Sequence, residues 1–84
     1  IDVTEVNAAL DAVPGVRETH DLHIWTLTSG MEVASAHLTT EPDADPTTVL
    51  AAAQTLLAER FHLEHATVQV EPPESEGRCR ELQW

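Results

Sequence analysis

Two kinds of hydrophobic spacing follow one another along this 84-residue chain, and their order limits the folds open to it. Alternating or β-branched residues, typical of strands, run from Val16 to Leu27, from Met31 to Thr40 and from His65 to Val70. Residues 3–13 and 47–60 instead place apolar side chains at the three- and four-residue intervals of a helix. The predicted order of elements is therefore helix, strand, strand, helix, strand.

Local signals predict where these elements begin and end. Asp2-Val3-Thr4-Glu5 has the form of a capping box, and Pro14-Gly15 ends the helix that follows it. Asp45 is placed to cap the second helix, with Pro46 at the first helical position. The Thr-Ser-Gly sequence at residues 28–30 predicts the turn of a hairpin between the first two strands.

One face of the predicted sheet is apolar. Successive side chains of a strand point to opposite faces, so parity (odd or even position) places Ala34, Ala36 and Leu38 together on one face of the second strand. The third strand alternates in the same way. The two helices have to cover this face. We therefore predict an α+β fold, a ferredoxin-like sandwich in which two helices pack on one face of a three-stranded antiparallel sheet.

Composition narrows the classes of function. Fifteen acidic residues against four basic ones give a net charge of −11, which repels phosphate backbones, so no nucleic-acid partner is expected and metal cations are the natural counter-charge. No apolar run reaches the roughly 18–20 residues of a membrane helix. A single cysteine, Cys79, favours a reducing compartment. Because Ile1 is not an initiator residue, we expect this sequence to be part of a longer chain.

Three of the five histidines fall on the first two predicted strands, and imidazole is a common metal ligand. Parity places His37 and Glu71 on the face that the helices leave uncovered, here called the open face. On the first strand, strict alternation places His23 on the open face. A bulge near Asp21 would instead let His20 turn toward His37, and the residue pattern leaves both alternatives open.

The open face also suggests a contact surface. An exposed tryptophan on an uncovered sheet usually marks such a surface, so we expect a homodimer whose contacts include Trp25, His23 and Gln69. Any single strand histidine, taken alone, is more often hydrogen-bonded to its neighbours than bound to a metal. No motif groups a nucleophile, a base and an orienting residue, so no enzyme is predicted.

Three sequence blocks, in order, carry a resemblance to a known family: His20-Asp21-Leu22-His23-Ile24-Trp25, Ser35-Ala36-His37-Leu38 and His65-Ala66-Thr67-Val68-Gln69-Val70-Glu71. They resemble the cytoplasmic C-terminal domain of cation diffusion facilitator transporters, most closely the zinc and cobalt-zinc-cadmium branch. That resemblance implies a metallochaperone-like fold that dimerises below a six-helix transmembrane domain and regulates it. Residues 1–73 would then form the metal-binding dimerisation domain, and residues 74–84 a flexible acidic tail.

The resemblance also implies a metal site. It matches the ligands of the family to His20, His37 and Glu71, preferring His20 to His23, with His65 and Cys79 as residues that could complete the site. The implied ion is Zn²⁺, with Co²⁺, Cd²⁺, Mn²⁺ or Fe²⁺ as alternatives. Affinity should fall as the pH drops toward about 6, because protons compete for imidazole. The alternative function is a stand-alone dimeric interaction or sensing domain, or a metallochaperone, although metallochaperones usually present paired cysteines.

Overall fold

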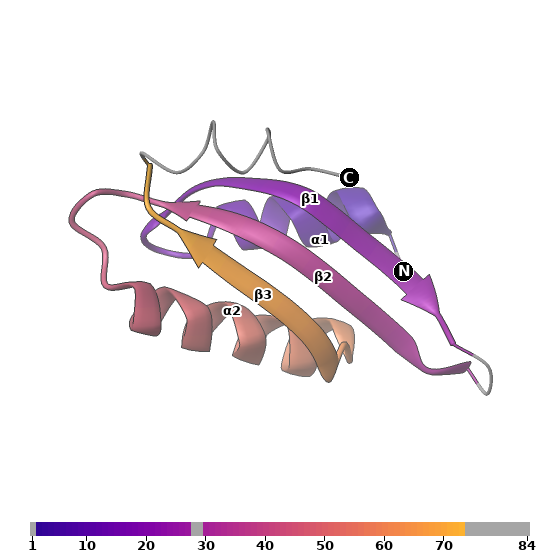
Figure 1. Cartoon of the computed structure of the whole chain (residues 1–84). Coiled ribbons are helices and arrows are strands. Elements are labelled where there is room, and N and C mark those ends of the chain that lie inside the picture. Colours follow the sequence, from indigo (N-terminus) through magenta and orange to yellow (C-terminus); the bar gives the residue numbers. More distant parts are fainter. Residues whose placement is uncertain (1, 28–29, 74–84) are drawn as a thin grey trace.

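A computed structural model describes residues 2–27 and 30–73. It contains α1 (Val3–Asp11), β1 (Val16–Thr26), β2 (Glu32–Thr40), α2 (Pro46–Phe61) and β3 (His65–Glu71). The predicted order of elements and the α+β class are confirmed. Figure 1 shows the three strands side by side, with both helices on the same face of the sheet. The tail predicted at 74–84, with Cys79, and two residues of the predicted turn lie outside the described residues.

Both helices begin at the caps that the sequence predicts. The Asp2 carboxylate accepts the backbone N–H of Thr4 at 2.9 Å, and the Asp45 carboxylate accepts that of Thr47 at 3.3 Å. At the other end of α2, His62 adopts a left-handed conformation with φ 59°. The backbone N–H of Leu63 then bonds to the carbonyl of Leu57 at 2.8 Å, which turns the chain back toward the sheet and buries Leu63.

The sheet is mixed, so the prediction of an all-antiparallel sheet was wrong. β1 and β2 form an antiparallel hairpin, whereas β3 runs parallel to β2. The reason is the connection: the short link between β1 and β2 reverses the chain, whereas α2 carries the chain back along the sheet before β3 begins. A strand that follows such a helical crossover enters in the direction of the previous strand.

β1 is bulged in the middle. His20 pairs with His37, but the next regular pair joins His23 to Ser35, so β1 contains one extra residue. Asp21 lies inside this bulge with a φ of 53°, a left-handed conformation that aspartate tolerates better than most residues. The bulge proposed from the sequence is therefore present. Since cross-strand partners share a face, both His20 and His23 lie on the open face.

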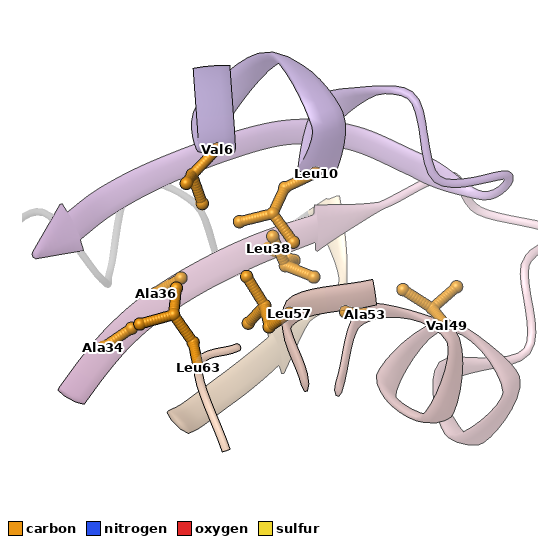
Figure 2. Packing of buried hydrophobic residues seen from close by; sticks show 9 residues of the cluster. All are labelled: Val6, Leu10, Ala34, Ala36, Leu38, Val49, Ala53, Leu57 and Leu63. Atoms are coloured by element: carbon orange, nitrogen blue, oxygen red, sulfur yellow. The ribbon is translucent and has the colours of Figure 1, made fainter. Parts of the chain in front are cut away.

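The core lies between the sheet and the two helices. Figure 2 shows how side chains from both helices and from β2 converge there. Ala34, Ala36 and Leu38 of β2 are buried, which confirms the predicted apolar face of the sheet. The small alanines let the helices approach closely, and Leu38 fills the centre against Leu10 of α1. Polar strand residues are thus displayed on the open face.

Candidate metal centre

Four ionisable side chains from all three strands meet at one end of the open face. His20 and Asp21 come from β1, His37 from β2 and Glu71 from the end of β3. The strand pairing brings them together, because His20 lies opposite His37, and Glu71 lies opposite Thr39, two residues further along β2. We call these four residues the histidine–carboxylate cluster.

Glu71 contacts both histidines of the cluster. Its Oε1 lies 3.3 Å from Nε2 of His20, and its Oε2 lies 3.2 Å from Nδ1 of His37. The two imidazole rings are edge to face, with their centroids 5.4 Å apart. The structure thus brings together the three residues that the resemblance matches to the family ligands.

Asp21 is a fourth member that the sequence analysis did not include among the site residues. Its Oδ2 lies 3.4 Å from Nδ1 of His20 and 3.7 Å from Nδ1 of His37. One ligand atom each from His20, Asp21 and His37 lie within 4.8 Å of one another. A carboxylate next to a candidate ligand, at the position where a bulge was suspected, was the signal that could have identified it.

The burial of Glu71 is unusual for a carboxylate. Only 4% of the residue is exposed, and Oε2 accepts a hydrogen bond from the Gln69 side-chain amide at 2.9 Å. Oε1 is fully buried and has no hydrogen-bond partner with suitable geometry among the described residues, although it lies near His20 Nε2. A buried charged oxygen is costly unless a donor or a cation faces it. A hydrogen-bond donor or a cation beside Oε1 of Glu71 would therefore stabilise the cluster.

The cluster has the donor types and the spacing of a zinc site. Zinc bonds of about 2.0–2.2 Å in a tetrahedron separate neighbouring ligand atoms by about 3.3–3.6 Å. Two contacts join the candidate ligand atoms: Glu71 Oε1 lies 3.3 Å from His20 Nε2, and Glu71 Oε2 lies 3.2 Å from His37 Nδ1, both close to this separation. The Thr39 hydroxyl, itself buried, adds a polar contact at 3.3 Å from His20 Nε2. Imidazole nitrogen with carboxylate oxygen is a common ligand set for zinc.

The other residues singled out in the sequence lie outside the four-residue cluster, although Gln69 borders it. His65 is exposed and pairs with Val33 at the start of β3, six residues and about 20 Å of strand from Glu71. His23 and Trp25 are exposed on the open face. Gln69 is exposed there as well, and its side-chain amide donates to Glu71. None of the helices in the described part of the chain is long and apolar enough to cross a membrane.

Comparison with known proteins identifies the family. The sequence model of the family "Cation efflux protein, cytoplasmic domain" matches residues 1–73 of this chain, which include every described strand and helix. The chain belongs to this family. The resemblance inferred from the three sequence blocks is therefore confirmed, and the cytoplasmic location follows from the family's description.

Relatives of this domain occur in bacteria and animals. "Probable proton-coupled zinc antiporter SLC30A3" of Rattus norvegicus is 47% identical over 85 residues and aligns with 96% of this chain. "Metal cation efflux system protein CzcD" of Cupriavidus metallidurans is 39% identical over 72 residues and aligns with 84% of it. The chain spans only 22% and 23% of the length of these two relatives.

Solved structures agree with the fold. The metal-bound C-terminal domain of the CzcD transporter from Cupriavidus metallidurans superposes with a TM-score of 0.80 at 39% identity, over 84% of this chain and 99% of that one. A MamM C-terminal domain, at 20% identity and a TM-score of 0.70 over 82% of this chain and 91% of that one, shares the fold. The ferredoxin-like sandwich predicted from the sequence is thus confirmed, apart from the direction of β3.

Proposed function

We propose that this domain binds Zn²⁺ at the histidine–carboxylate cluster, dimerises through the open face and thereby regulates a cation-transporting membrane domain in a longer protein. The names of the relatives, a zinc antiporter and a metal cation efflux protein, support this role. So does the neighbouring structure, whose title describes a metal-bound domain. The single observation that carries the proposal is the buried Glu71 oxygen without a hydrogen-bond partner beside two imidazoles.

In this proposal Nε2 of His20, Nδ1 of His37 and the carboxylate of Glu71 hold the ion. Asp21 faces the other ring nitrogen of His20 at 3.4 Å. It would accept a hydrogen bond from Nδ1–H and so keep the Nε2 lone pair free for the metal. A ligand histidine usually donates its second N–H to a carboxylate in this way, which fixes its tautomer and ring orientation. His65 is not a member of the proposed ligand set.

Metal binding would change the electrostatics of the domain. It places a dication against a carboxylate that is 4% exposed, and it offsets part of the charge of −11 that each protomer carries. Like charges oppose the approach of two protomers, so neutralisation favours their association. Trp25, 45% exposed on the open face beside Val33, is the proposed apolar contact between the two copies. Coupling of this kind between two sites is typically worth about 1–3 kcal/mol.

Isothermal titration with zinc at pH 7.5, combined with sedimentation velocity with and without zinc, tests the proposal. Wild type should bind zinc and sediment as a larger species when zinc is present. The double change His37→Ala and Glu71→Gln should abolish both effects. His65→Ala is the matched control, because it removes an exposed imidazole from the far end of the same face and should change neither. Absence of zinc binding by wild type would contradict the proposed function.

A further inference from the structure

The last residue of α1 breaks a local rule. Asp11 lies at the C-terminal end of the helix, where the backbone carbonyls make a negative charge unfavourable, and the last turn contains no basic residue. Aspartate also has a low helix propensity. Residues that violate such local preferences often serve another part of the structure. What the Asp11 carboxylate contacts is therefore informative.

Asp11 links α1 to β1. Its Oδ1 accepts the backbone N–H of Thr19 at 3.0 Å in a partly buried hydrogen bond, and its Oδ2 is 3.4 Å from the side-chain amide of Asn7, which donates to it. β1 is an edge strand, so no neighbouring strand lies on its outer side. The side chain of Asp11 thus occupies the place that a backbone carbonyl of another strand would take in a wider sheet.

The residue held in this way directly precedes His20. The pairing of β1 with β2 is irregular on both sides of it, between Val16 and Glu18 and again between His20 and His23. Only Glu18, Thr19 and His20 pair in an unbroken register between these two irregularities. Thr19 is 9% exposed and pairs with Leu38 of the core face. This short stretch lies between two irregularities of the pairing, and the bond from Asp11 gives the backbone that carries the His20 ring a second attachment besides β2.

We infer that Asp11 is a positioning residue for the metal site, acting through the Thr19 amide on His20. This inference rests on the proposed function, since it assigns a role within the same site. Asp11 is not a ligand in this arrangement. Its carboxylate keeps Nε2 of His20 at the distance from Glu71 that a shared ion requires.

The test is zinc affinity of the full 84-residue chain, measured by titration calorimetry at pH 7.5 for wild type and three variants. Asp11→Ala should weaken zinc binding a few-fold, less than the roughly 10- to 100-fold that follows loss of a group bonded directly to a ligand, because Asp11 acts through the Thr19 backbone. Asp11→Asn should retain the wild-type affinity, because the amide oxygen still accepts the Thr19 N–H. Asp43→Ala removes one charge from an exposed loop and should have no effect. Alanine favours helix more than aspartate does, so the variant chain should fold.

Unchanged affinity in Asp11→Ala would overturn the inference, as would equal weakening in Asp11→Asn, which would indicate a charge effect. Hydrogen exchange of the Thr19 amide in the metal-free wild type gives a measurement that needs no variant. Slow exchange of the Thr19 amide supports the inference, whereas exchange as fast as that of a solvent-exposed amide on an edge strand overturns it. If wild type itself binds no zinc, the proposed function fails; if wild type binds and Asp11→Ala binds equally well, only this inference fails.

Discussion

Replacing Glu71 by glutamine should change stability in opposite directions with and without zinc. In the metal-free domain the change removes a charge from a side chain that is 4% exposed and that has one buried oxygen without a hydrogen-bond partner. The new amide could donate to Nε2 of His20, now 3.3 Å from Oε1, and could still accept from Gln69. Relief of an unsatisfied buried group is worth about 1 kcal/mol or more. In a domain of this size that corresponds to a Tm about 4–8 °C higher.

With zinc the order of stability should reverse. A ligand at 100 times its Kd stabilises the folded state by about 2.7 kcal/mol, which raises the Tm of wild type by about 10–20 °C. Glu71→Gln loses a charged ligand, so zinc at the same concentration should raise its Tm far less. The two melting curves, measured by circular dichroism at pH 8, would therefore cross as zinc is added. Protons compete little for imidazole at that pH.

The result that would refute this reasoning is specific. If Glu71→Gln melts below wild type in the absence of metal, the buried Oε1 of Glu71 is already stabilised by its surroundings, and the argument from an unsatisfied oxygen fails. If zinc raises the Tm of both proteins equally, Glu71 is not a ligand. Val49→Ala serves as a control because it removes volume from the core. Its Tm should be lower than that of wild type both with and without zinc, but zinc should raise it by the same amount as in wild type.

Four further outcomes follow from the same geometry. Asp21→Asn should weaken zinc binding about 10- to 100-fold in calorimetry, and a larger loss than that of Glu71→Gln would mean that Asp21 is the ligand and Glu71 the orienting carboxylate. Trp25→Ala should weaken zinc-dependent dimerisation about tenfold in sedimentation equilibrium while leaving the zinc affinity of the monomer intact. Leu38→Ala should lower the free energy of unfolding in urea by about 2–5 kcal/mol, since Leu38 is fully buried. Zinc affinity should fall between pH 7.5 and 6, because binding releases protons from the ligand histidines, and calorimetry in two buffers of different ionisation enthalpy would count them.

Much of the fold was readable because local chemistry and global packing agree. Asp2 and Asp45 cap their helices as their positions predict, and the alternation around Leu38 gave the buried face. The direction of β3 was predicted wrongly because the alternation of apolar and polar residues is the same in a parallel strand and in an antiparallel one. Only the crossover through α2 decides it, and that argument was available from the order of elements.

The candidate site was predictable in part for a related reason. Parity placed His37 and Glu71 on the open face, where the structure brings them to 3.2 Å of each other. It could not choose between His20 and His23, because one extra residue in β1 puts both on that face. The role of Asp21 depends on its left-handed backbone inside the bulge, a three-dimensional feature that spacing along the chain does not encode. The hydrogen bond from Thr19 to Asp11 joins two elements and was equally hidden.

The most direct test of the metal-site assignment is a crystal structure of this chain grown with zinc, with diffraction data collected on both sides of the zinc absorption edge. The account predicts an anomalous peak on the open face within about 2.0–2.2 Å of Nε2 of His20, Nδ1 of His37 and a carboxylate oxygen of Glu71. A zinc peak at any other set of side chains, with the histidine–carboxylate cluster empty, would contradict it.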